Sequence, residues 1–247
     1  MNSVGILFLG SGDAFGSGGR LQSSILVESP EGRFLIDCGP SALIGLKRFG
    51  FDTSGIGTVL ISHLHGDHYG GVPFLVKETQ VTGEREIPLV IAGPYALESH
   101  VENVMKLFFP SPENPRSGFW PDFRILPQSE KTQIGDLAVT AYPAKHSKMA
   151  NPLSLRIECG GKTIAYSGDT EWNEFLPVVC KDADVFICET FEYERSAGNH
   201  LDYLTLMEHR RELDCKRILL THLGDSMLNR CGAIELECAY DGMSFTV

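Results

Sequence analysis

The amino-acid sequence predicts an α/β fold in which helices cover largely buried β-sheets. Two observations carry this prediction: short apolar runs alternate with stretches of helical character, and two segments far apart in the chain share one order of elements. The apolar runs are rich in Val, Ile, Leu and Phe and are bounded by Gly, Pro, Asp or Ser, as is typical of strands. We expect strands at residues 4–9, 23–28, 33–37, 58–62, 88–92, 136–142, 153–158, 162–167, 184–188 and 217–221.

Helices are expected between several of these strands, at residues 40–49, about 70–81, 95–107, 171–180 and about 200–213. No low-complexity tract or obvious linker divides the sequence, and 247 residues are enough for one large core. We therefore expect a single domain over residues 1–247, although two small domains would also fit this length.

A weak internal repeat links the two halves of the chain. Residues 23–39 and 153–169 both read as a strand, a glycine-containing turn, a second strand and an aspartate near its end. Each segment is followed by a candidate helix and then by a buried strand, 58–62 in one half and 184–188 in the other. Two similar β-rich halves would pack face to face, with a site along their shared edge. The alternative is that two hairpins resemble each other by chance.

The charge balance restricts the class of substrate. The formal net charge is −11, and the short clusters of Lys and Arg are not dense. Proteins that grip a long nucleic acid through its phosphates normally concentrate these residues, so the composition argues against such a partner. A small anionic substrate remains compatible, because bound metal ions supply positive charge locally.

The N-terminus and the cysteines indicate the compartment. The first apolar run is too short for a signal sequence, and no run is long enough to span a membrane. The seven cysteines are scattered and form no Cys-x-x-Cys pair, which favours reduced, mostly buried thiols over a zinc knuckle. We expect a cytoplasmic protein without a membrane partner.

Residues 108–130 form a Pro-rich, aromatic stretch. Long loops of this kind are often lids or binding loops. A packed connector or a dimer contact would fit the same composition, so the sequence leaves these three interpretations open.

A dense group of metal-ligand residue types directly follows the strand expected at 58–62: His63, His65, Asp67 and His68. In a chain leaving a strand, His63 and His65 project to the same side. A tight turn at Gly66 would then direct Asp67 and His68 to a neighbouring point. Imidazole and carboxylate groups suit zinc, iron and manganese, so the segment predicts two adjacent metal ions rather than a solvated polar turn.

Three more candidates end other apolar runs: His146, Asp169 and His222. Each alone could be a loop, turn or strand-end residue without a metal. Together they repeat one arrangement, a buried strand that ends in a potential ligand, and converging strand ends are a natural place to assemble a site.

These motifs resemble those of the metallo-β-lactamase superfamily, and within it the ribonuclease Z-like and cyclic-phosphate phosphodiesterase-like branches. The resemblance spans nearly the whole chain, and it is carried by His63-x-His65-x-Asp67-His68, Ala144-Lys145-His146-Ser147, Tyr166-Ser167-Gly168-Asp169-Thr170, Leu220-Thr221-His222-Leu223-Gly224, Leu9-Gly10-Ser11-Gly12 and Phe34-Leu35-Ile36-Asp37-Cys38-Gly39. It implies an αββα sandwich of two similar halves, with the metals between the sheets. It also implies a homodimer.

The resemblance assigns the ligands residue by residue. It implies that the first metal is held by His63, His65 and His146, the second by Asp67, His68 and His222, and that Asp169 bridges the two. Zinc is the expected metal, with manganese or iron as alternatives. Asp37 ends a buried strand ahead of these ligands, and it either orients a metal-bound histidine or caps the helix at 40–49.

The expected chemistry is hydrolysis by a hydroxide that two metals activate, with Asp67 orienting it. The leaving group then needs a proton, for which His200 is the candidate general acid. A carboxylate from Glu189 would orient and charge that imidazole, as in the Glu/His pair of the resembling phosphodiesterases. Where the RNA-processing branch has a His-Ser-Thr type segment, this chain has His200-Leu201-Asp202, and it lacks a Lys-rich arm, which argues against a transfer RNA substrate.

The preferred function is therefore a phosphodiesterase acting on a small phosphodiester. A hydrolase of lactones, thioesters or other carboxylic derivatives would use the same metals. An iron-dependent redox protein is a third reading, although no flavin-domain or rubredoxin-like segment is visible, and a non-catalytic binding module is a fourth. His200 could instead cap a helix start, and Glu189 could form a structural ion pair.

Overall fold

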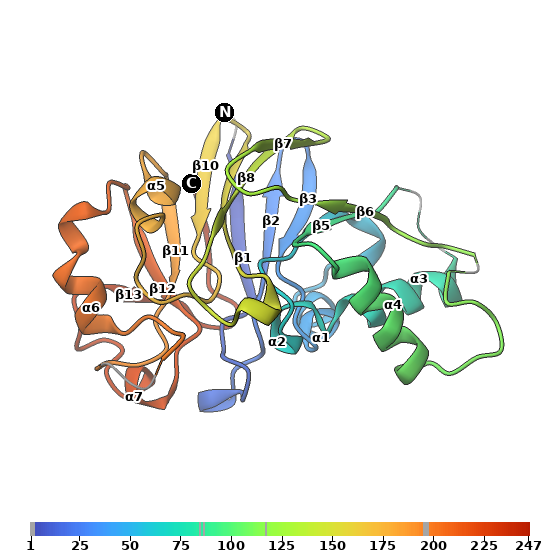
Figure 1. Ribbon diagram of the computed structural model, residues 1–247, viewed down its shortest axis with the longest axis horizontal. Helices are drawn as coiled ribbons and strands as arrows, with labels where there is room; N and C mark the ends of the chain where they lie inside the picture. The colour runs from blue at the N-terminus through green and yellow to red at the C-terminus, as the bar shows by residue number, and fades with distance from the viewer. Residues whose placement is uncertain (1–2, 84, 86, 117, 195–197) are drawn as a thin grey trace.

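The computed structural model describes residues 3–83, 85, 87–116, 118–194 and 198–247. The described chain forms two mixed sheets packed face to face, with helices on their outer sides (Figure 1). The first sheet has the order β14-β1-β2-β3-β4-β5-β6 and the second β13-β12-β11-β10-β9-β8-β7. This is the expected αββα sandwich.

The seven strands of each sheet have the following bounds. The first sheet contains β1 (Gly5–Gly10), β2 (Ser24–Ser29), β3 (Gly32–Ile36), β4 (Ile56–Leu60), β5 (Val90–Gly93), β6 (Asp122–Ile125) and β14 (Ser244–Thr246). The second contains β7 (Lys131–Ile134), β8 (Leu137–Pro143), β9 (Leu153–Cys159), β10 (Lys162–Tyr166), β11 (Val185–Glu189), β12 (Ile218–Thr221) and β13 (Glu237–Cys238). The helices are α1 (Ala42–Arg48), α2 (Gly66–Tyr69), α3 (Val72–Thr82), α4 (Leu97–Phe108), α5 (Leu176–Cys180), α6 (Tyr203–Glu208) and α7 (Asp225–Leu228), with short 3₁₀ turns η1 (Ser17–Gly19), η2 (Thr53–Gly55), η3 (Lys148–Ala150) and η4 (Arg210–Glu212).

Alternating side chains of the central strands divide the core into layers. In β3, Phe34 and Ile36 point between the sheets, whereas Leu35 packs under the helices of the first half. In β11, Ile187 faces the space between the sheets and Phe186 faces α5 and α6. Both faces of these strands are buried, which explains why they read as nearly continuous apolar runs.

The internal repeat is confirmed as a repeated structural unit. The hairpin β2–β3 is antiparallel and β3 then pairs in parallel with β4, while β9–β10 and β10–β11 repeat the same two relationships in the second sheet. Every strand expected from the sequence is present, with its ends shifted by a residue or two.

Two helices begin three or more residues later than expected, for reasons visible in the hydrogen bonds at their starts. The helix expected at 171–180 starts only at Leu176, because Asn173 accepts the backbone N–H of Phe175 and holds a turn before it. The helix expected at about 200–213 starts at Tyr203, where the side chain of Asp202 accepts the backbone N–H of Thr205.

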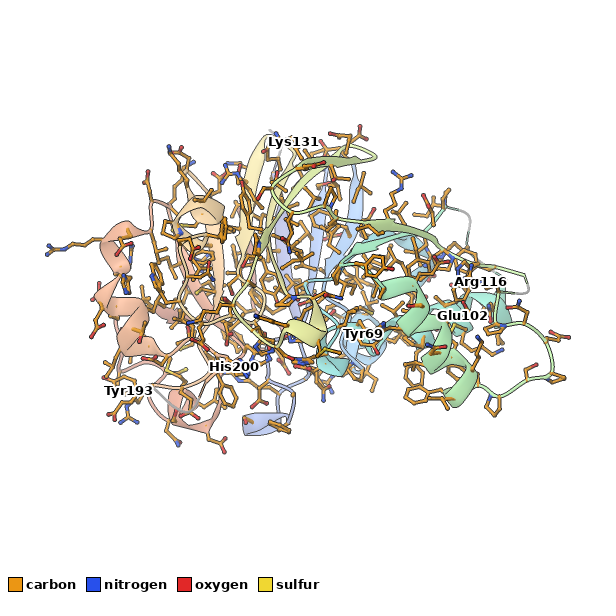
Figure 2. All side chains as sticks on the ribbon, in the orientation of Figure 1. Tyr69, Glu102, Arg116, Lys131, Tyr193 and His200 are labelled. Atoms are coloured by element: carbon orange, nitrogen blue, oxygen red, sulfur yellow. The ribbon has the colours of Figure 1, made fainter. Side chains whose placement is uncertain are left out.

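The Pro-rich stretch at residues 108–130, which the structure describes except for residue 117, packs against the helices of the first half. Gln80 of α3 donates to the carbonyls of Pro115 and Phe119, and Arg116 pairs with Glu102 of α4. Figure 2 places Glu102 and Arg116 far along the long axis from His200. These contacts favour the packed connector over a lid.

Among the helices of the described residues, none combines the length and the apolar character that crossing a membrane requires.

Candidate metal centre

Loops at the ends of strands from both sheets bring the predicted ligands together. His63 and His65 follow β4, His146 follows β8, Asp169 follows β10 and His222 follows β12. The structure gathers the seven residues into two groups, in each of which the potential ligand atoms lie within 4.8 Å of one another: His63, His65, His146 and Asp169 in one, and Asp67, His68, Asp169 and His222 in the other. Asp169 belongs to both.

In the first group, three imidazole nitrogens face one point. Nε2 of His63 lies 3.2 Å from Nδ1 of His65, and Nε2 of His146 lies 3.0 Å from the same Nδ1. Both contacts converge on Nδ1 of His65, which carries either one proton or one lone pair, so the three nitrogens share a single position between them. A shared cation would accept all three lone pairs. Burial lowers the pKa of His63 well below its usual value and also lowers that of His146, which favours the neutral form that binds metals.

In the second group, the imidazole of His68 meets two carboxylates without good hydrogen-bond geometry. Nε2 of His68 lies 3.1 Å from Oδ2 of Asp67 and 3.3 Å from Oδ1 of Asp169. Both Nε2 of His68 and Oδ1 of Asp169 are nevertheless buried and lack a hydrogen-bond partner. Buried polar atoms rarely remain unpaired, so this donor set fits a cation better than it fits a protein-only network. Nε2 of His222 lies 3.2 Å from Oδ2 of Asp67 on the other side.

Backbone conformation at the strand ends directs these side chains inward. Gly168, the residue before Asp169, has a φ of 58°, and a Cβ there would lie 2.6 Å from the carbonyl oxygen of Leu153. His222 has a φ of 57°, a conformation that is uncommon for a non-glycine residue and is concentrated at functional sites. The chain turns at Gly66 as expected, where the one-turn helix α2 begins, but the turn does not require a glycine, because a Cβ there would meet open space.

Asp37 anchors the second group from behind. Its buried carboxylate accepts hydrogen bonds from Nδ1 of His68, the hydroxyl of Tyr166, and both the backbone N–H and the hydroxyl of Ser62. This arrangement corresponds to the orienting role. The alternative role as a helix cap is wrong, because Ser41 precedes α1. Sequence reasoning missed Tyr166 and Ser62 as partners, although both adjoin the ligand motifs.

The predicted Glu189–His200 pair lies at the edge of the cluster. Nδ1 of His200 is 3.1 Å from Oε2 of Glu189 and 3.9 Å from Oδ2 of Asp169. The ring stacks on that of His222, with their centroids 5.6 Å apart (His200 is labelled in Figure 2). Burial, followed by the charge of Asp169, raises the pKa of Glu189 well above its usual value. Cations held by the neighbouring ligand residues would oppose this shift and favour the ionised carboxylate.

The capping role considered for His200 receives no support from the geometry, whereas a structural ion pair of Glu189 with His200 remains compatible with it. His200 does not cap α6, because Asp202 does. Glu189 contacts the imidazole of His200 and the backbone N–H of Thr170, both beside the metal-ligand residues. Ala197, which begins the segment containing His200, lies outside the described residues.

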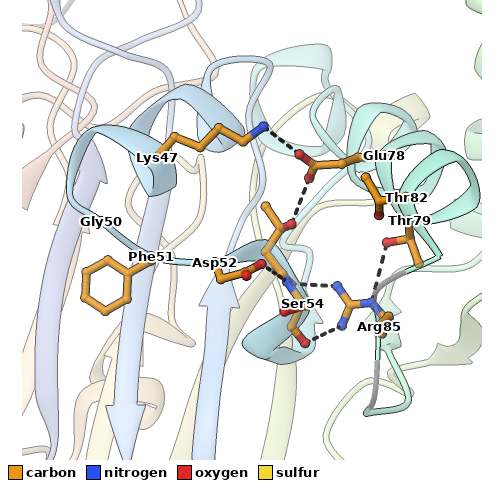
Figure 3. A pocket seen from close by; sticks show the side chains of 10 residues that line it. Lys47, Gly50, Phe51, Asp52, Ser54, Glu78, Thr79, Thr82 and Arg85 are labelled. Atoms are coloured by element: carbon orange, nitrogen blue, oxygen red, sulfur yellow. Dashed lines mark hydrogen bonds and ion pairs between the residues drawn. The ribbon is translucent and has the colours of Figure 1, made fainter.

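A cavity of about 440 Å³ elsewhere in the molecule does not take part in this arrangement (Figure 3). It lies between α1, η2 and α3, and none of its lining residues is a predicted site residue. The guanidinium of Arg85 is engaged by the carbonyls of Thr53 and Ile56, and Lys47 pairs with Glu78. Its charged groups therefore serve the local fold.

Comparisons with known proteins agree with this geometry. The family described as Anti-Pycsar protein Apyc1 matches residues 4–237. An anti-Pycsar protein Apyc1 from Bacillus phage 010DV004 is 33% identical over 241 residues, covering 92% of this chain and 91% of the relative. Ribonuclease BN from Cronobacter sakazakii is 25% identical and covers 98% of this chain and 99% of its own. The crystal structure of the metallo-β-lactamase fold protein YhfI from Bacillus subtilis covers 100% of both chains with a TM-score of 0.79 and 20% identity, which shows the shared fold.

Proposed function

Since this chain belongs to the anti-Pycsar protein Apyc1 family, within the metallo-β-lactamase superfamily, we propose that it is a metal-dependent phosphodiesterase acting on a small phosphodiester such as a cyclic nucleotide. The observation that carries the proposal is the position of the Glu189–His200 pair. A proton donor lies beside two groups of metal-ligand residues that share Asp169. A hydrolase with a leaving group that needs no proton would have little use for this donor.

The donor set fits two divalent cations. His63, His65 and His146 would hold one ion, Asp67, His68 and His222 the other, and Asp169 would contribute to both. Imidazole with carboxylate suits zinc, and manganese and iron accept the same ligands. When bound, such a pair supplies a water of lowered pKa and neutralises charge that grows on the phosphate oxygens.

The chain's own residues supply orientation and the proton. Asp67 has an oxygen 3.1 Å from Nε2 of His68 and 3.2 Å from Nε2 of His222, so its carboxylate can both ligate and accept a hydrogen bond from the attacking water. His200, held through Nδ1 by Glu189, presents its other ring nitrogen to the leaving oxygen and donates the proton there. The carboxylate of Glu189 stabilises the imidazolium before the transfer.

The charge distribution supports a small substrate. A chain with a net charge of −11 has few cations to follow a long phosphate backbone, and the local positive charge would come from the ions. We therefore propose a small anionic phosphodiester rather than a long nucleic acid, in the cytoplasm, without a membrane partner.

Hydrolysis assays on the protein loaded with zinc or manganese test the proposal. We expect turnover of bis(p-nitrophenyl) phosphate and of cyclic mononucleotides, and loss of both after chelation. A lactone and a thioester serve as the competing substrates. Clear lactone or thioester hydrolysis without phosphodiester cleavage would overturn the proposal in favour of a carboxylic-derivative hydrolase, and a coloured, iron-loaded protein that consumes oxygen would favour the redox alternative.

A further inference from the structure

One short loop links a metal-ligand residue to the candidate proton donor. Nδ1 of His146 donates a 2.6 Å hydrogen bond to the carbonyl of Asn199, the residue directly before His200. The rings of His146 and His200 lie with their centroids 4.9 Å apart. Any movement of Asn199 therefore alters the support of His146 and the position of His200 together.

Asn199 is held in a conformation that needs external support. Its φ is 71° and that of Gly198 is 83°, so the chain makes two consecutive left-handed steps. Asparagine tolerates this region better than most residues, but the conformation persists only where neighbours fix it. The site therefore depends on whatever holds this backbone in place.

Glu171 makes that contact. Its Oε1 accepts the backbone N–H of Asn199 at 3.0 Å, and its Oε2 pairs with the ammonium of Lys145 at 2.7 Å. Its own backbone N–H donates to the carbonyl of Lys145, the neighbour of His146. Glu171 thus joins the segment that follows Asp169 to the segments that carry His146 and His200.

We propose that Glu171 is a positioning residue, which fixes the imidazole of His146 and the approach of His200 by holding Asn199. The part that concerns His200 rests on the proposed function. The part that concerns His146 depends only on the donor set, because an outer hydrogen-bond acceptor fixes which ring nitrogen faces a metal. The oxygen of Glu171, rather than its charge, carries the role, since the contact with Asn199 needs only an acceptor.

Variants of Glu171 separate these contributions. Glu171→Ala removes the acceptor, Glu171→Gln keeps an oxygen acceptor but loses the charge, and Lys145→Gln removes only the ion pair. Glu174→Ala, an exposed carboxylate on the same segment, is the matched control. We expect Glu171→Ala to weaken both the protection of the backbone amides around residue 199 and the binding of metal. The other three variants should behave nearly like the wild type.

Two readouts do not depend on turnover. Hydrogen exchange of the backbone amides around residue 199 should speed up at least ~10-fold in Glu171→Ala. The visible spectrum of the cobalt-loaded protein should change, and cobalt affinity should fall by about 10-fold or more, as for other outer-shell losses. Unchanged exchange and an unchanged spectrum would overturn the proposal, as would equal effects of Glu171→Ala, Glu171→Gln and Lys145→Gln.

The leaving group reports on His200. p-Nitrophenolate departs without a proton, whereas the alkoxide of a cyclic nucleotide needs one, so Glu171→Ala should slow cyclic nucleotide cleavage more than cleavage of bis(p-nitrophenyl) phosphate. Equal slowing of both would overturn the part that concerns His200. If the wild type cleaves neither, the proposed function fails, while the exchange and cobalt measurements still test the hold on His146.

A substitution within the loop provides an independent check should Glu171→Ala fold poorly. Asn199→Val disfavours the left-handed backbone without touching Glu171, and Asn199→Gly permits it. We expect the valine variant to reproduce the exchange and cobalt effects and the glycine variant to avoid them. The reverse order would overturn the proposal.

Discussion

Asp37 accepts a 2.6 Å hydrogen bond from Nδ1 of His68, although the two residues lie 31 positions apart in the chain. Both side chains are fully buried. The hydrogen bond turns Nε2 of His68 towards Asp67 and Asp169, and the hydroxyl of Tyr166 donates to the same carboxylate oxygen of Asp37. The orientation of the ring is therefore built into the fold before any ligand arrives.

Removing the Asp37 carboxylate should weaken metal binding. We expect Asp37→Ala to lower metal affinity by about 10–100-fold, because the ring of His68 loses the acceptor that fixes it. Competition with a chromophoric chelator on the metal-stripped protein measures this. Asp136→Ala, in the exposed turn after β7, is the control. An Asp37→Ala protein that binds metal as tightly as the wild type would contradict the orienting role.

Removing the imidazole of His200 should impair proton donation while the ligands remain. We expect His200→Ala to lower kcat for a phosphodiester with an alkoxide leaving group by roughly 10²–10⁴-fold, with metal content unchanged. Steady-state kinetics and elemental analysis of the same preparation check this. His100→Ala, on α4, is the matched control. Parallel loss of activity and metal would show that His200 is a ligand or a structural residue.

Gly39, unlike Gly66, is a glycine that the packing of the metal-ligand loop requires. A Cβ on Gly39 would overlap the carbonyl oxygen of Asp67 and lie 2.9 Å from Cβ of Gln22, whereas Gly66 faces open space. We expect Gly39→Ala to destabilise the fold by about 1–3 kcal/mol, as other overpacking changes do, and to displace Asp67. Gly66→Ala should leave the stability of the fold and the position of Asp67 close to those of the wild type. Urea denaturation and metal titration compare the two, and equal effects would contradict this assignment.

The buried thiol of Cys38 should make the protein less stable in alkali. Burial, with the charge of Asp37 adding to it, raises the pKa of Cys38 to about 12, whereas an unfolded thiol has a pKa of about 8.5. Between these values the unfolded chain loses a proton that the folded chain keeps, so stability is full below pH ~8.5 and falls as the pH rises towards 12. We expect Cys38→Ala to show a shallower fall in urea denaturation over this range, with Cys231→Ala as the control. Identical slopes for wild type and Cys38→Ala would contradict the assignment.

The sequence was sufficient to predict the buried strands but not those at the sheet edges. Central strands such as β11 are covered on both faces and consist largely of apolar residues, so they can be recognised in the sequence as apolar runs. The side chains of β6 are largely exposed and include Asp122 and Arg124, and β13 has only two residues. Edge strands of this kind lack an apolar signature because solvent covers part of their surface.

The candidate site was predictable to the extent that its chemistry is local. His63 and His65 sit in one short motif, and Asp169 and His222 end apolar runs. The residues that orient them were not predictable, because a hydroxyl such as that of Tyr166 or a carbonyl such as that of Asn199 occurs throughout any chain. Tyr166 and Asp37 are separated by 129 positions, and only the packing of the two sheets reveals the pairing.

Strand β14 pairs with β1, so residues 244–246 complete the sheet that residues 5–10 begin. During synthesis, the second half of the chain must leave the ribosome before β1 receives this neighbour. Until then, the backbone groups of β1 on that side are available to strands of other nascent chains. The topology thus exposes newly made protein to aggregation over most of the time that translation takes, and the risk ends only when β14 emerges.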